Sequence, residues 1–205
     1  MLPPAPLWLG PAPLLLASTS PTRRLLLEGA GLPVETAAPG IDERALEAEA
    51  GLAPAALALR LAEAKAASVA ALHPDRVVVG ADQVLDADDT VFHKPAGLEE
   101  ARAQLARLAG RTHALHAAVA IARGGRVESF VETAHLTLRP LDAAQVAAYV
   151  ALAGADRVRS SVGGYQVEGL GIHLFARIAG AHSTILGLPL LPLLARLRGL
   201  GLLGL

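Results

Sequence analysis

Short aliphatic runs alternate with helix-like segments along most of this chain, and this alternation constrains the fold more than any other feature. Strand-like runs lie at residues 14–17, 34–38, 77–80, 113–122, 127–138 and 172–178. Helix-like segments lie after Ser20-Pro21, at 54–72 and 97–109, after Asp142, and after Pro189 or Pro192. Hairpin turns are expected at residues 86–89 and at Gly124-Gly125, so some neighbouring strands are antiparallel. The pattern predicts an α/β fold, a mixed twisted sheet with flanking helices.

The length of 205 residues fits one domain of ordinary size. Residues 1–13 are rich in proline, so we expect an irregular extension there, followed by a single domain over 14–205. A membrane-spanning helix needs about 20 consecutive apolar residues. The most apolar stretch, residues 185–205, is interrupted by two prolines and two arginines. We therefore expect no membrane span.

The charges are nearly balanced, with 18 Lys and Arg against 19 Asp and Glu. Nucleic-acid-binding domains usually carry a basic stripe, and only 3% of the residues are aromatic, which disfavours a base-stacking surface. We expect no nucleic-acid partner. The chain has no cysteine, which excludes disulfides, thiolate metal sites and a cysteine nucleophile and is compatible with the cytoplasmic location that we expect.

Hydroxyl groups and arginines gather where the first strand passes into the first helix, in the segment Ser18-Thr19-Ser20-Pro21-Thr22-Arg23-Arg24. A helix N-terminus attracts anions, and arginine donates paired hydrogen bonds to phosphate oxygens. The segment is a candidate phosphate site. A capped helix with solvated arginines would show the same residues.

Asp82 and Gln83 follow the buried valine run at 77–79. At the mouth of an α/β sheet, a carboxylate can hold a hard divalent cation or accept a proton from water, although a simple turn aspartate fits the pattern as well. Glu43 offers further oxygen ligands, and Lys65 and Lys94 could supply positive charge to phosphates. Each of these three is a weak signal alone.

Other polar groups have simpler interpretations. Asp86, Asp88 and Asp89 could form a metal loop, but solvated turn residues explain them better. His113 and His116 are three apart on an expected strand, so they point to opposite faces and are poorly placed to chelate a metal. The chain contains no G-x-x-x-x-G-K-[ST] phosphate loop, G-x-G-x-x-G, G-x-S-x-G or H-E-x-x-H motif.

Taken in order, several separated motifs resemble the Maf family of nucleoside triphosphate pyrophosphatases over nearly the whole chain. They are LLLASTSPTRR, GIDE, LAEAKA, VVVGADQV, HKP, LAGRTH, GGYQVEGLGI and ILGLPL. The resemblance implies an α/β fold with two lobes around a deep cleft, often dimeric. It also implies hydrolysis of a nucleoside triphosphate between the α- and β-phosphates with Mg²⁺ or Mn²⁺.

By motif matching, Asp82 stands at the family's proton acceptor, and its carboxylate could equally ligate the metal. The phosphate and metal site would be lined by Ser18, Ser20, Arg23, Glu43, Lys65 and Lys94. The resemblance leaves open a nucleotide-binding regulator of cell division, although the intact charged set favours an enzyme.

Substrate preference in the family follows three positions, which here are Thr22, Gln83 and Glu168. Arg, Thr and Gln there are typical of the dTTP/UTP subgroup, and Trp, Gln and Glu of the 7-methyl-GTP subgroup. Two of three positions therefore predict a 7-methyl-GTP enzyme, with dTTP/UTP as the alternative. A carboxylate at 168 can accept the two adjacent donors of guanine, whereas Thr22 departs from both patterns.

Overall fold

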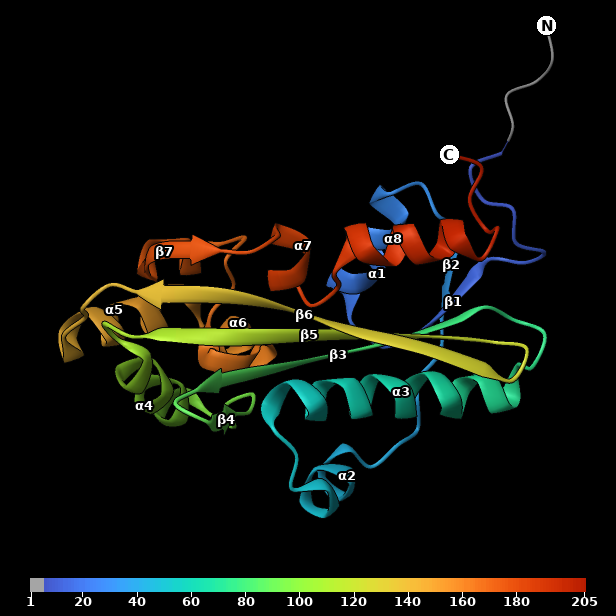
Figure 1. Ribbon diagram of the computed structural model, residues 1–205. Coiled ribbons are helices and arrows are strands. Elements are labelled where there is room, and N and C mark those ends of the chain that lie inside the picture. Colours follow the sequence, from blue (N-terminus) through green and yellow to red (C-terminus); the bar gives the residue numbers. More distant parts are fainter. Residues whose placement is uncertain (1–5) are drawn as a thin grey trace, which may run out of the picture. The chain divides into compact units, whose positions relative to one another are not determined.

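The computed structural model describes residues 6–205, apart from the side chains of residues 49 and 50, as two compact units (Figure 1). The first unit comprises the chain up to Gln83, residues 117–132 and residues 182–205; the second comprises residues 84–116 and 133–181. Two units agree with the two lobes that the resemblance predicts. The cleft between them stays a prediction.

One mixed sheet accounts for all the strands in the described residues. The strands are β1 (Leu14–Ala17), β2 (Val34–Thr36), β3 (Val78–Ala87), β4 (Thr90–Phe92), β5 (Thr112–Arg123), β6 (Arg126–Leu138) and β7 (Phe175–Ala179). Their order is β2-β1-β3-β5-β6-β7, with β4 paired to β3. β1 runs parallel to β2 and β3, whereas β4 and β7 are antiparallel to their neighbours. The predicted mixed α/β fold is confirmed.

In the first unit, helices cover both faces of the sheet (Figure 1). α1 (Pro21–Gly29) and α8 (Leu190–Gly199) lie on one face, and α3 (Pro54–Leu72) lies on the other. The core beneath α1 and α8 consists of buried aliphatic side chains, among them Leu14, Leu16, Leu27, Val79, Leu193 and Leu197. The aliphatic C-terminal stretch is therefore core. Across residues 6–205, no helix has both the length and the hydrophobicity that a membrane crossing requires.

In the second unit, short helices surround the ends of β5 and β6. They are α4 (Leu98–Leu108), α5 (Ala143–Ala153), α6 (Ala155–Ser160) and the 3₁₀ helices η1 (Val162–Gly164) and η2 (Leu170–Leu174). α5 begins at a capping box, in which the Asp142 side chain accepts from the Gln145 backbone and the Gln145 side chain accepts from the Asp142 backbone. This confirms the start predicted at Asp142.

Several element boundaries differ from the sequence prediction. β3 continues through Asp82 and Gln83, so Asp82 lies inside a strand and not after its end. β2 stops at Thr36, and residues 172–174, expected to begin a strand, belong to η2. The helices α2 (Glu43–Ala50), α6 and α7 (His182–Ile185) were not predicted.

The expected irregular extension falls partly outside the described residues, since residues 1–5 are not among them. In the described part, Trp8 forms an isolated antiparallel bridge with Leu203, and the Leu9 N–H donates to the Leu202 carbonyl at 2.9 Å. These contacts tie residues 8 and 9 to the C-terminal segment.

Candidate active site

A buried ammonium group joins two carboxylates in the first unit. Lys65 Nζ on α3 lies 2.5 Å from Asp82 Oδ1 on β3 and 2.9 Å from Glu43 Oε1 at the start of α2. The side chains of Lys65 and Asp82 are only 7% and 9% exposed, whereas that of Glu43 is 52% exposed. Burying a charge is costly unless it is paired, and the buried Lys65 ammonium is paired with both carboxylates.

The close packing of α3 on β3 explains why Lys65 reaches Asp82. A Cβ at Gly80 would lie 2.3 Å from the Ala62 carbonyl oxygen and 2.6 Å from the Ala66 backbone nitrogen, so only glycine lets the helix come this near. Because alternate residues of a strand share a face, Asp82 points to the same side as Gly80 and meets Lys65. The glycine and two alanines therefore position the charged pair.

Arg23, in the first turn of α1, is anchored beside this cluster by groups distant in sequence. Its Nε donates to the Gly187 carbonyl at 2.9 Å, and its Nη1 donates to the Ala81 carbonyl at 2.8 Å and to Ser18 Oγ at 3.3 Å. Burial lowers the pKa of the Arg23 guanidinium, and the negative charges of Asp82 and Glu43 act in the opposite direction. The structure thus brings Arg23 close to the predicted carboxylates.

The start of α1 is organised by two serines, as the sequence analysis proposed. Ser20 Oγ accepts from the Arg23 backbone N–H at 3.4 Å, and Ser18 Oγ accepts from the Ser20 backbone N–H at 3.2 Å. Thr22 lies in the same first turn and is half-buried. Ser18, Ser20, Thr22 and Arg23 therefore occupy one helix N-terminus of the first unit.

Gln83 points away from Asp82, toward the C-terminal end of α7. Its Nε2 donates to the carbonyls of Thr184 and Ile185 at 3.1 and 3.0 Å. Gly187 adopts a φ of +85°, and a Cβ there would meet both Arg23 and Gln83. Sequence reasoning did not identify this role of Gly187, although ILGLPL, which contains it, was among the motifs.

The remaining predicted residues, Lys94 and Glu168, belong to the second unit. Both side chains are exposed. Lys94 follows β4, and Glu168 lies in the glycine-rich segment between η1 and η2. Their parts in a common site with the first-unit residues stay predictions.

Two histidines of β5 lie in separate environments. His113 Nε2 is 2.5 Å from the Tyr165 hydroxyl, and burial lowers the His113 pKa to about 4. His116 Nδ1 is 2.9 Å from Thr133 Oγ1, and its Nε2 is 3.9 Å from Asp86 Oδ2. Burial lowers the His116 pKa and raises that of Asp86.

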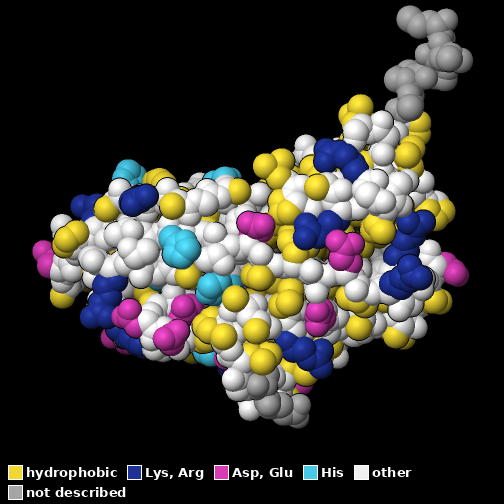
Figure 2. Space-filling view, in the orientation of Figure 1, with side chains coloured by type: hydrophobic (Ala, Val, Ile, Leu, Met, Phe, Trp, Pro, Cys, Tyr) yellow, Lys and Arg dark blue, Asp and Glu magenta, His cyan; other side chains and the backbone are white. Residues whose placement is uncertain are grey.

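Asp88 and Asp89 form the tight turn between β3 and β4. Asp88 and Asp89 take positive φ angles of 51° and 59°, as tight hairpins require, and Asp88 pairs with Arg111 at 2.9 Å. Within the part of the chain that the structure describes, no group of three or more His, Cys, Asp or Glu side chains is arranged around a metal position. Figure 2 shows basic and acidic side chains interspersed on the visible face.

The donor set around Lys65 nevertheless suits a hard divalent cation. Asp82 and Glu43 both supply carboxylate oxygens, which Mg²⁺ and Mn²⁺ prefer. Both carboxylates contact the same Lys65 ammonium group, so an oxygen of each lies close to the other. Mg²⁺ is commonly held by one or two carboxylates together with substrate phosphates, and this pair fits that pattern.

Comparison with known proteins matches nearly the whole chain. The family model described as Maf-like protein covers residues 13–200. A nucleoside triphosphate pyrophosphatase of Rhodopseudomonas palustris is 54% identical over 194 residues, 94% of this chain and 96% of that protein. One from Nitrobacter winogradskyi is 53% identical over 201 residues, 97% and 99% of the two chains.

A protein of Brucella abortus with the name 7-methyl-GTP pyrophosphatase is also similar. It is 51% identical over 189 residues, which are 90% of this chain and 94% of that protein. The family predicted from the separated motifs is confirmed by these matches. Matched along most of its length by one family model and by relatives above 50% identity, the chain belongs to the family of Maf-like proteins.

Proposed function

We propose that this protein hydrolyses a nucleoside triphosphate between its α- and β-phosphates, releasing the monophosphate and pyrophosphate, and that 7-methyl-GTP is its preferred substrate. The protein is a hydrolase acting on acid anhydrides, the class of its relatives. The observation that carries the proposal is the buried Lys65 ammonium held between Asp82 and Glu43. Such a cluster places positive charge beside a carboxylate that can accept a proton.

The first-unit residues have separate roles in the proposed cleavage of the phosphoanhydride bond. A triphosphate brings about four negative charges, so the reaction depends on cations aimed at the phosphates. Arg23 is fixed through Nε and Nη1, which leaves its Nη2 end for a phosphate oxygen. Lys65 adds a second cation, and Lys94 would add a third. Asp82 orients the attacking water and accepts its proton.

A divalent cation, Mg²⁺ or Mn²⁺, would be held by Glu43 and Asp82. Bound there, it would neutralise phosphate charge and lower the pKa of water. Lys65 contacts both carboxylates, so it holds them close together.

The preference for 7-methyl-GTP is supported by Gln83, by Glu168 and by the name of the Brucella abortus relative. A carboxylate accepts hydrogen bonds from the adjacent N–H groups of guanine and offsets the positive charge of the methylated ring. The edge of thymine or uracil offers neither this pair of donors nor the positive charge. Thr22 cannot stack on that ring as tryptophan would. Recognition therefore depends mainly on Glu168.

The test is a nucleotide panel with pyrophosphate as the readout. The kcat/KM values of wild type and Glu168→Gln are compared on 7-methyl-GTP, GTP, dTTP and UTP, with Mg²⁺ and with Mn²⁺. We expect 7-methyl-GTP to be preferred by wild type and the preference to fall about tenfold in the variant. A preference for dTTP would overturn the substrate assignment, and tight nucleotide binding without pyrophosphate release would favour a regulatory binding protein.

A further inference from the structure

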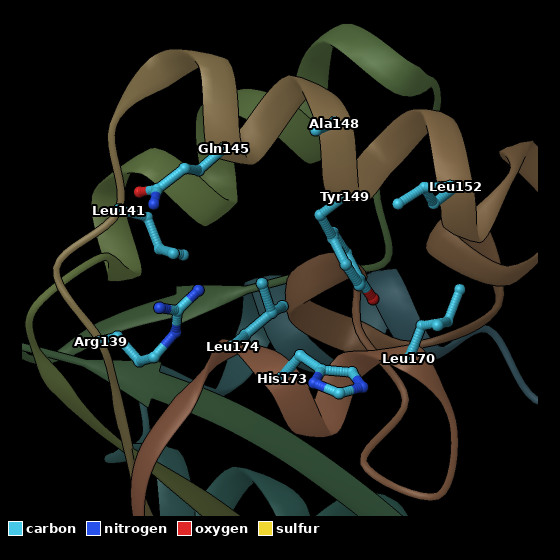
Figure 3. Close-up of a pocket in the computed structure, with 9 residues that line it drawn as sticks. All are labelled: Arg139, Leu141, Gln145, Ala148, Tyr149, Leu152, Leu170, His173 and Leu174. Carbon is cyan, nitrogen blue, oxygen red and sulfur yellow. The ribbon is translucent and has the colours of Figure 1, made fainter.

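An apolar pocket lies within the second unit, between α5 and η2 (Figure 3). Its volume is about 260 Å³. Figure 3 shows Tyr149 on α5 pointing toward Leu170 and His173 on η2, with Arg139 at one end. The lining residues are Arg139, Leu141, Gln145, Ala148, Tyr149, Leu152, Leu170, His173 and Leu174. None of them was among the predicted site residues.

The helix that forms one wall is unusual for a surface helix. α5 has the sequence AAQVAAYVALA, which contains no charged residue. Leu152 is 74% exposed on it, and Leu170, on the opposite wall, is 38% exposed. A helix that is apolar on all sides is normally covered, so this face is suited to an apolar ligand.

The one permanent cation of the pocket has no internal partner. Among residues 6–205, the Arg139 guanidinium forms no ion pair or side-chain hydrogen bond, and the pocket lining includes no acidic residue. The carboxylate of Asp142, the nearest acid in sequence, is engaged in the capping box of α5. The exposed arginine therefore places a positive charge without a protein partner among the described residues at the end of an apolar cavity.

We propose that this pocket binds a small amphiphile with one anionic group, whose apolar part lies against Tyr149, Leu170 and Leu174 and whose anion pairs with Arg139. An apolar cavity of about 150 Å³ holds benzene, and ligand pockets commonly begin at about 300 Å³. The occupant is therefore a single ring or an alkyl chain of medium length. A carboxylate or a phosphate monoester would satisfy the arginine equally, because both accept paired hydrogen bonds.

The test is a titration of the full-length protein followed by backbone amide NMR. The probes are octanoate, octyl phosphate and octylammonium, each below its micellar concentration, and 1-octanol below its solubility limit. We expect saturating shifts in α5 and η2 with the two anions, and at least tenfold weaker binding of octylammonium and octanol. The stronger of the two anions identifies the head group.

Two variants and a control separate this site from non-specific adsorption. Arg139→Gln should weaken octanoate binding about tenfold and leave octanol binding unchanged, and Ala148→Trp should fill the pocket and abolish both. Arg177→Gln removes another exposed arginine of the same unit and should change neither. The proposal is overturned if octylammonium binds as tightly as octanoate, if the shifts lie elsewhere, or if millimolar octanoate causes none. Pyrophosphate release should be unaffected by all three variants, so the result is independent of the proposed function.

Discussion

Each unit contains a polar cluster with buried members, and the two clusters differ in charge. In the first unit, the Lys65 ammonium forms ion pairs with the carboxylates of Asp82 and Glu43, at 2.5 and 2.9 Å. In the second, His113 and Tyr165 share a hydrogen bond of 2.5 Å in which neither carries charge near neutral pH. Burial lowers the His113 pKa to about 4 and raises the Tyr165 pKa.

This difference in charge indicates a different role for each cluster. The His113–Tyr165 hydrogen bond is neutral, and the Tyr165 ring packs edge-on against Phe175. Such a pair can hold a loop at small electrostatic cost. A buried ammonium with two carboxylates is a costly way to hold a helix on a strand, because apolar residues of similar size often stabilise as well or better. We therefore attribute the charged cluster to the proposed hydrolysis, and the neutral one to the positioning of the glycine-rich segment.

Removing the ammonium should have the largest effect on stability. We expect Lys65→Met to lower the free energy of unfolding at pH 7 by about 3–5 kcal/mol, because Asp82 is left buried without its counter-charge. Urea unfolding measures this, and Glu43→Gln serves as the control. Since the Glu43 side chain is 52% exposed, that control should lose less than about 1 kcal/mol. Equal losses in the two variants would contradict the distinction.

A single added Cβ atom at residue 80 tests the close approach of α3 to β3. We expect Gly80→Ala to destabilise the protein by about 3 kcal/mol, because the added Cβ would collide with backbone atoms of Ala62 and Ala66. The matched control is Gly29→Ala, where a Cβ would meet nothing within 4 Å. Thermal unfolding of both variants checks the prediction, and a neutral Gly80→Ala would show that α3 is free to move outward.

The neutral cluster should make stability depend on pH. Below its ordinary pKa of 6.5, His113 binds a proton in the unfolded chain but not in the folded one until about pH 4. The free energy of unfolding should therefore decrease as the pH is lowered through this interval, and His113 should account for about 3 kcal/mol of the decrease. His113→Phe should flatten the slope, and His173→Gln, at an exposed histidine, should leave it unchanged. An unaltered slope in His113→Phe would refute the assignment.

Loss of the hydrogen bond alone should have the smallest effect. We expect Tyr165→Phe to cost about 2 kcal/mol, since His113 then has no partner at Nε2. The His113 Nδ1 atom is already without one among the described residues. Urea unfolding at pH 7 gives the value, and a loss as large as that of Lys65→Met would mean that charge is not what separates the two clusters.

Much of the fold follows from sequence because it depends on local patterns. The Ser20 and Asp142 caps and the Gly124-Gly125 turn are each specified by neighbouring residues, and all lie where they were predicted. The end of β3 was misplaced for a related reason. A charged residue after an apolar run reads as a strand end unless its partner is known, and the partner, Lys65, lies 17 residues away.

The site was predicted residue by residue but not as an arrangement. Motif matching named Arg23, Lys65 and Asp82, yet it could not show that Arg23 is anchored to Gly187, which is 164 residues distant. Residues 172–174 were expected to begin a strand, but they belong to η2, whose leucines line the pocket. Such contacts follow from tertiary packing, which no local pattern encodes.

We propose that the charged cluster performs the hydrolysis. The most direct test compares substitutions of two carboxylates on β3. Asp82 and Asp86 lie on the same strand, with side chains 9% and 17% exposed, but only Asp82 contacts Lys65. The measurement is pyrophosphate release by Asp82→Asn and Asp86→Asn from the nucleotide that wild type hydrolyses fastest. We predict a loss of more than about 100-fold for Asp82→Asn and less than about threefold for Asp86→Asn. Near wild-type release by folded Asp82→Asn would contradict the account.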